Sequence, residues 1–201
     1  MKYDEIICIG ACCEVSFAIQ NYNLSLISYP FDWLLVHSLA DVSKTISNNF
    51  KEFENIHIEK NPDYARNIYQ LDNLNIWLPH YNKNLDSIIQ KCENFRKILV
   101  SNKKVLFIYK SHIFRSPTFE EVELFIKTIK SLSNIDFDFL IINECQIGSK
   151  PCNYPDGVLI KNLFGNPSLE FSEPNAKCIF PCNWDSKIHN NVWNSILKTI
   201  N

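Results

Sequence analysis

The sequence lacks an excess of charge of either sign and lacks any long hydrophobic run. Its 201 residues carry 20 Lys and Arg against 22 Asp and Glu, for a formal net charge of −2, and the basic residues do not cluster. This balance argues against nucleic acid as the main partner. No stretch approaches the roughly 18 apolar residues that a membrane-spanning helix needs. We therefore expect a protein that binds neither nucleic acid nor a membrane.

Glycine and methionine are scarce, with 4 and 1 copies, whereas cysteine occurs 8 times. Disulfides, metal sites and free thiols are the three uses that an even cysteine count allows. The first five residues include two acids, and the apolar run that follows spans only residues 6–9, which is unlike a signal peptide. We therefore expect a cytoplasmic protein with reduced cysteines. Hydrophobic residues make up 46% of the chain, which excludes global disorder.

Short apolar runs alternate along the chain with amphipathic helical patterns. Buried strands are predicted at residues 6–9, 105–109 and 137–142, with weaker strands at 157–160 and 177–180. Helical spacing of apolar residues predicts helices that follow residues 13, 84, 116 and 187. This alternation predicts one domain over residues 1–201, a three-layer α/β sandwich of Rossmann or flavodoxin-like type with a mainly parallel sheet.

Two local expectations accompany this fold. Ser116 is predicted to cap the third helix, with Pro117 in its first position. The polar segment 50–77 is expected to form short strands or a helical excursion.

Ligands of parallel α/β sheets bind beyond the carboxyl ends of the strands. This rule selects the loops at residues 10–14, 110–112, 143–145 and 181–185. Cys13 is the most informative residue among them, because it is predicted to begin a helix directly after a buried strand. Backbone N–H groups and the helix dipole there favour a thiolate and can hold an oxyanion. The alternative is that Cys12 and Cys13 are small packing residues of the core.

A second dense segment, residues 28–33, reads Ser-Tyr-Pro-Phe-Asp-Trp. It places one acid, Asp32, among large aromatic side chains. Asp32 could orient a histidine or bind substrate. It could instead cap a helix that starts near Trp33, with the aromatic rings in the core.

These two segments resemble the signature of an uncharacterised family of papain-like cysteine peptidases. Residues 9–16, Ile-Gly-Ala-Cys-Cys-Glu-Val-Ser, are similar to its Gly-Ser-x-Cys-x-hydrophobic-Ala pattern. Residues 28–33 are similar to its Ser-x-Pro-Phe-Asp-Trp pattern. The likeness continues through residues 77–81, 95–99, 104–109, 184–185 and Trp193 and so covers most of the chain.

The resemblance implies a role for three residues. Cys13 occupies the position of the family cysteine and would be the nucleophile, His80 would be the base, and Asp32 would orient that base. The chain departs from the pattern at Ala11 and Ser16, and also at Tyr81, where the family tends to have an acid after the histidine. The resemblance therefore implies a thiol hydrolase or acyl-transfer enzyme acting on a peptide or small-molecule substrate, and we expect no cofactor.

Two other readings remain open. Cys12 or Cys13, with Asp185 and His189, is similar to the flavodoxin-like serine-hydrolase arrangement of esterases, with cysteine in place of serine. Alternatively, the same loops recognise a ligand or glycan without catalysis.

The remaining cysteines fall into two groups. Cys8 and Cys92 lie on apolar faces and are expected in the core. The other four cysteines could bind zinc, since thiolates at suitable spacing can converge on one zinc ion. The candidate set is Cys145, Cys152, Cys178 and Cys182, but its spacings are looser than those of paired zinc knuckles.

Overall fold

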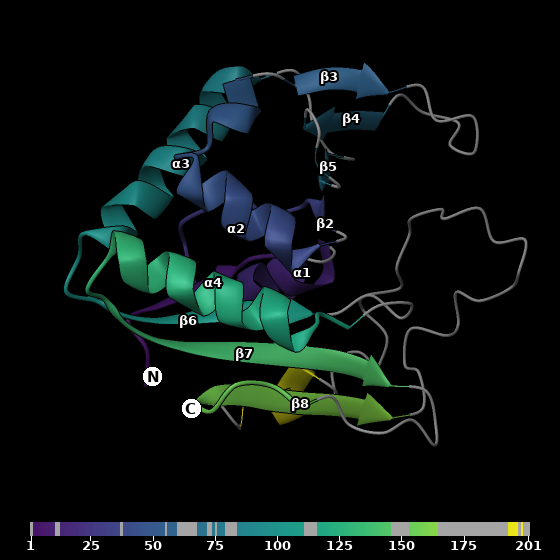
Figure 1. Ribbon diagram of the computed structural model, residues 1–201, viewed down its shortest axis with the longest axis vertical. Helices are drawn as coiled ribbons and strands as arrows, with labels where there is room; N and C mark the ends of the chain where they lie inside the picture. The colour runs from purple at the N-terminus through teal and green to yellow at the C-terminus, as the bar shows by residue number, and fades with distance from the viewer. Residues whose placement is uncertain are drawn as a thin grey trace, which may run out of the picture.

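A computed structural model describes most of the chain. The described residues are 2–10, 13–36, 38–54, 56–59, 68–71, 74, 76–78, 84–110, 116–145, 153–164, 193–196 and 198. They form a mixed α/β fold with one parallel sheet, one antiparallel sheet and several helices (Figure 1). Within them, no helix combines the length and the apolarity that crossing a bilayer requires.

The parallel sheet contains the strands that the apolar runs predict. Its order is β1-β6-β7-β8, and every neighbouring pair is parallel. The strands are β1 (Glu5–Cys8), β6 (Lys104–Lys110), β7 (Asp136–Cys145) and β8 (Val158–Phe164). The prediction of a mainly parallel sheet is thereby confirmed for three of its strands at nearly the predicted positions, and β8 extends the weaker prediction at 157–160.

Both faces of this sheet are buried. Alternate residues of each strand point to opposite sides, so each strand contributes to both faces. In β6, Val105, Phe107 and Tyr109 join one apolar cluster, whereas Leu106 and Ile108 join another. The first cluster includes residues of α2 (Leu39–Ser47), α3 (Leu85–Leu99) and α4 (Phe119–Leu132). The second includes residues of α1 (Cys13–Asn21) together with Trp193 and Ile196. The sheet therefore has helical elements on both sides.

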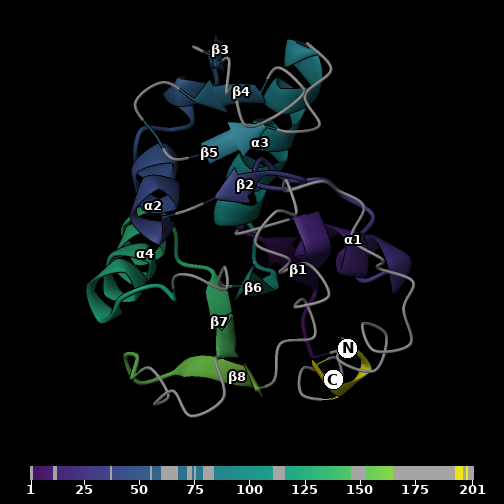
Figure 2. The same cartoon turned by 90° about the vertical axis from the view of Figure 1, so that its right-hand side faces the viewer.

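A second sheet lies in the excursion between α1 and β6. Its order is β2-β5-β4-β3, and all of its pairs are antiparallel. The strands are β2 (Leu35–Val36), β3 (Ile56–Glu59), β4 (Ile68–Leu71) and β5 (Ile76–Leu78), and η1 (Lys51–Glu54) is a 3-10 turn before β3. Figure 2 shows these strands stacked above the parallel sheet, with β2 nearest to it. The described part of residues 50–77 contains both short strands and the helical turn η1, so each of the two expectations for this segment is met in part.

The start of α4 corrects one prediction. Its N-cap is Thr118, not Ser116, and the helix begins at Phe119. The Thr118 side chain accepts a hydrogen bond from the Glu121 backbone N–H at 3.2 Å, and the Glu121 carboxylate accepts one from the Thr118 N–H at 3.0 Å. This reciprocal capping box satisfies two backbone donors at once, which a serine two residues earlier would not do.

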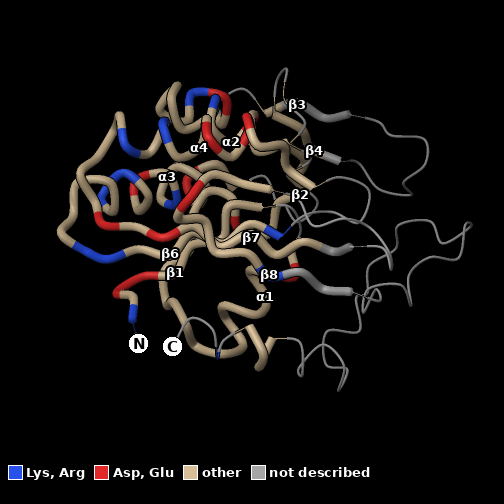
Figure 3. The backbone as a smooth tube through the Cα atoms, turned by 60° about the horizontal axis from the view of Figure 1, so that its bottom comes forward, with Lys and Arg blue, Asp and Glu red and all other residues tan. Residues whose placement is uncertain are grey.

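Charged residues of both signs are interspersed over the described backbone (Figure 3). Ion pairs such as Lys104–Asp136 and Lys127–Glu123 connect neighbours on its surface. The pattern agrees with the near-neutral composition, and α3 and α4 each contain residues of both signs.

Candidate functional site

The connection from β1 to α1 depends on a glycine. Gly10 has a φ of +111°, and a Cβ atom at this position would lie 2.6 Å from the Cβ of Val36. Both its backbone conformation and its close approach to β2 therefore require the absence of a side chain. The Gly10 carbonyl accepts a hydrogen bond from the Lys110 N–H at 3.2 Å, which joins this turn to the end of β6.

Cys13 is the first residue of α1, as the sequence predicts. Its side chain is fully buried and forms no disulfide. A sulfur in the first turn lies near backbone N–H groups that have no partner within the helix, and near the positive end of the helix dipole. The backbone N–H groups and the dipole favour a thiolate, whereas the full burial of the side chain favours the neutral thiol.

Glu14, the next residue, forms a buried ion pair. One of its carboxylate oxygens lies 2.6 Å from the Lys110 Nζ, and the two side chains are only 13% and 4% exposed. The other oxygen accepts a hydrogen bond from the Trp193 indole at 3.2 Å. The end of β6, the start of α1 and the C-terminal helical segment therefore meet at Glu14, and the ammonium of Lys110 balances its carboxylate.

Asn143 lies further along the same edge of the sheet. It is fully buried in β7, and its side-chain oxygen accepts a hydrogen bond from the Tyr154 hydroxyl at 3.1 Å. The sequence predicts residues 143–145 as a loop beyond the strand, but β7 extends to Cys145, so Asn143 is a strand residue. Nothing in the local sequence indicates Tyr154 as its partner.

Asp32 lies in a tight turn that the Pro-Phe-Asp-Trp segment forms. The Asp32 N–H donates to the Tyr29 carbonyl at 3.1 Å, and the Tyr29 N–H donates to the Asp32 carboxylate at 2.7 Å. No helix starts at Trp33, because β2 follows and α2 begins only at Leu39. The interpretation of Asp32 as a helix cap is therefore wrong. Its carboxylate instead accepts the N–H of Tyr29, three residues earlier in the chain.

Ser16 connects this turn to α1. Its hydroxyl donates to the Asp32 carboxylate at 3.3 Å and accepts from the Trp33 N–H at 3.1 Å. Trp33 has a φ of +65°, which is unusual for a large side chain, and the bond to Ser16 holds it there. Since Ser16 is one helical turn after Cys13, it lies on the same face of α1 as the thiol. The sequence marked Ser16 only as a departure from the family pattern, and its contact with Asp32 was not foreseen.

Burial raises the pKa of Asp32 to about 6, since its carboxyl group is 7% exposed and has lost most of its hydration. The hydrogen bonds from Tyr29 and Ser16 and the positive charge of Lys91 lower the pKa in part. The carboxyl group therefore changes its charge close to neutral pH.

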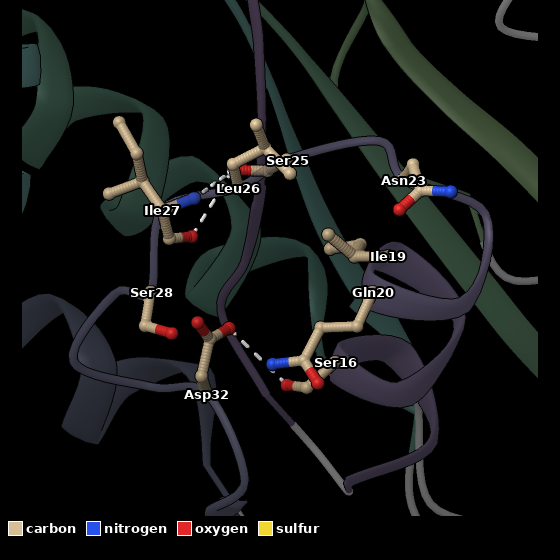
Figure 4. A pocket seen from close by; sticks show the side chains of 9 residues that line it. All are labelled: Ser16, Ile19, Gln20, Asn23, Ser25, Leu26, Ile27, Ser28 and Asp32. Carbon is tan, nitrogen blue, oxygen red and sulfur yellow. Dashed lines mark hydrogen bonds between the residues drawn. The ribbon is translucent and has the colours of Figure 1, made fainter.

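A small pocket of about 210 Å³ opens beside Asp32, between α1 and the chain that follows it (Figure 4). Three serines, two amides, one carboxyl and three aliphatic side chains line it. They are Ser16, Ile19, Gln20, Asn23, Ser25, Leu26, Ile27, Ser28 and Asp32.

Several predicted site residues lie outside the described part of the chain. These are Cys12, His80, Asp185 and His189, together with Cys152, Cys178 and Cys182 of the candidate zinc set. Cys145 ends β7, and its side chain is likewise outside the description. Among the described residues, no three His, Cys, Asp or Glu side chains are grouped to hold a metal ion. Cys8 and Cys92, predicted to be core residues, are buried.

Comparison with known proteins gives one match. The profile of the family described as "Putative papain-like cysteine peptidase (DUF1796)" matches residues 4–146. Searches of curated proteins and of solved structures give no match. The matched range includes the β1–α1 turn, Cys13, the Asp32 turn and strands β6 and β7. The chain therefore belongs to this family.

Proposed function

We propose that the protein is a cysteine-dependent hydrolase or acyl-transfer enzyme with Cys13 as its nucleophile. The position of this thiol carries the proposal: Cys13 begins α1 directly after a parallel strand, at the edge of the sheet where ligands bind. Membership in a family described as papain-like cysteine peptidases supports the same chemistry. The substrate is a peptide or a small molecule with an acyl group.

The reaction is a two-step acyl transfer. The Cys13 sulfur attacks the carbonyl carbon of the substrate, while the proton of the thiol passes to His80. Backbone N–H groups in the first turn of α1 stabilise the negative oxygen that forms. The leaving amine or alcohol takes the proton from His80 as the carbonyl re-forms, which yields a thioester. Water or another acceptor then attacks the thioester and releases the thiol.

In the proposal, Asp32 has one of two roles: it orients His80, or it binds the substrate. Its hydrogen bonds to Ser16 and Tyr29 and its place in the lining of the pocket support the binding role. Through Ser16, it also fixes α1 against the turn that contains Trp33.

The remaining features of the proposal concern the whole chain. Helical elements on both faces of the parallel sheet support a Rossmann or flavodoxin-like three-layer domain over residues 1–201, with the antiparallel sheet as an excursion. The absence of disulfides among the described Cys8, Cys13 and Cys92 supports a reducing, cytoplasmic setting.

Trapping of the acyl-enzyme tests the nucleophile. An activated ester such as p-nitrophenyl acetate is expected to release nitrophenolate in a burst and to leave an acetyl group on the peptide that contains Cys13, which mass spectrometry detects. Cys13→Ser is expected to abolish the burst, and Cys12→Ser, the matched control on the adjacent residue, to preserve it. His80→Ala is expected to slow the burst by about 10²-fold or more. A burst that survives Cys13→Ser and disappears in Cys12→Ser would assign the chemistry to the other thiol.

A second candidate function is ligand binding without catalysis. The full burial of Cys13 and the polar pocket beside Asp32 favour it. The trapping experiment separates the two functions, since a binding module would acetylate Cys13 no faster than a buried control thiol such as Cys92.

A further inference from the structure

The Asp32 carboxyl group lies at one end of the pocket. In Figure 4, the side chains of Asp32, Ser16 and Ser28 lie at this end, and Ser25, Leu26 and Ile27 lie at the other, where Leu26 and Ile27 are exposed. The Gln20 amide extends from α1 toward the carboxyl group. Within the described residues, the side chains of Gln20 and Ser28 make no hydrogen bond, so both retain their polar groups for a ligand.

Asp32 is the charged residue in this lining, which contains no Lys, Arg or His. Its carboxylate accepts two hydrogen bonds, from the Tyr29 N–H and the Ser16 hydroxyl. A carboxylate has about four acceptor positions, so about two remain. The positive charge of Lys91 lowers the pKa of Asp32. Within the described part of the chain, Asp32 forms no ion pair. A buried carboxylate without a paired cation is costly, and a cationic ligand would remove that cost.

We propose that this pocket binds an aliphatic primary ammonium group, with Asp32 as its anionic partner. The ammonium donates to the Asp32 carboxylate and the Ser28 hydroxyl, and the alkyl chain contacts Ile19. This binding goes beyond the acyl chemistry of Cys13 and does not depend on it.

The size and charge of the pocket restrict the ligand. A volume of about 210 Å³ is sufficient for a short alkylamine. An anion has no cation to meet in this lining. A neutral sugar or alcohol would satisfy the hydroxyl and amide groups but would leave the carboxylate without a counter-charge.

Titration of the folded protein with n-butylammonium tests the proposal, with n-butanol as the neutral isostere. Amide chemical shifts are recorded by two-dimensional NMR at a pH above 7, where Asp32 is ionised. We expect saturable shifts at residues 16, 20, 28 and 32 with the amine, and at least about tenfold weaker binding of the alcohol, because a charge-assisted hydrogen bond is lost.

Two variants locate the binding. Asp32→Asn is expected to weaken the amine at least about tenfold. Asp86→Asn, an exposed acid at the start of α3, is the matched control and should bind as the wild type does. Should Asp32→Asn fail to fold, Gln20→Lys provides the second variant. Gln20 is exposed on α1, so the fold tolerates lysine there, and its tethered ammonium should displace the amine.

Three results would overturn the proposal: no saturable shift with n-butylammonium, equal binding of n-butanol, or unchanged amine affinity in both Asp32→Asn and Gln20→Lys. Failure of the acyl-trapping experiment would leave this binding unaffected, so the two conclusions are tested separately.

Discussion

Replacing Gly10 by alanine tests whether the turn before Cys13 is held by a steric contact as well as by its backbone conformation. The φ of +111° alone costs a residue with a side chain about 1–3 kcal/mol. The new Cβ would also lie 2.6 Å from the Val36 Cβ and 2.9 Å from its Cγ2. Val36 is buried, so relief requires β2 to shift, which adds about 1–3 kcal/mol. Gly10→Ala should therefore destabilise the protein by about 2–6 kcal/mol.

The chain offers a matched control for this substitution. Gly157 also has a positive φ, of +87°, but a Cβ there would meet no atom within 4 Å. Gly157→Ala should therefore lose only the backbone part, about 1–3 kcal/mol. Urea unfolding followed by far-UV circular dichroism measures both free energies of unfolding. Equal losses for the two variants would refute the idea that the contact with Val36 fixes the turn.

Three further substitutions test individual contacts by urea unfolding. Lys110→Met removes the cation beside the buried Glu14 carboxylate and should cost about 3–5 kcal/mol. Lys104→Met, which breaks a surface pair, should cost less than about 1 kcal/mol, and similar losses for the two variants would contradict the burial argument. The pKa of Asp32 is raised from 3.8 to about 6, so between these values the folded state keeps a proton that the unfolded state has lost. The free energy of unfolding should therefore fall by about 2–3 kcal/mol as the pH rises from 4 to 6. Asp32→Asn should remove this part of the pH dependence, and an unchanged pH profile in the variant would refute the role of Asp32. Thr118→Ala should lower the free energy of unfolding by about 1 kcal/mol because it removes the capping box, and Ser116→Ala should change it almost not at all. A larger loss for Ser116→Ala than for Thr118→Ala would instead support Ser116 as the cap.

The parallel sheet was predictable because its strands are continuous apolar runs. Strands β6 and β7 are buried on both faces, so nearly every position requires an apolar side chain and the run stands out from its surroundings. The antiparallel sheet gave no such signal. Its strands have only two to four residues each, which is too short for a periodicity to develop.

The candidate site was predictable at single positions but not in its contacts. A strand, a glycine and a following helical pattern were sufficient to place Cys13 at the start of α1. The contact between Ser16 and Asp32 joins residues 16 positions apart, and the ion pair between Glu14 and Lys110 joins residues from distant segments. Neither pair has a local pattern, because both result from the way in which the chain returns to the same edge of the sheet. The correct cap at Thr118 was recoverable from its spacing to Glu121.

The pH dependence of Cys13 alkylation tests the central claim most directly. The measurement uses a Cys12→Ser background, so that mass spectrometry assigns the modified peptide to Cys13 alone, and compares that protein with the same protein carrying His80→Ala. The account predicts that Cys13 reacts with a midpoint well below the value of about 8.5 for a free thiol, and that His80→Ala moves the midpoint upward. A midpoint near 8.5 in both proteins would contradict the claim that Cys13 is an activated nucleophile.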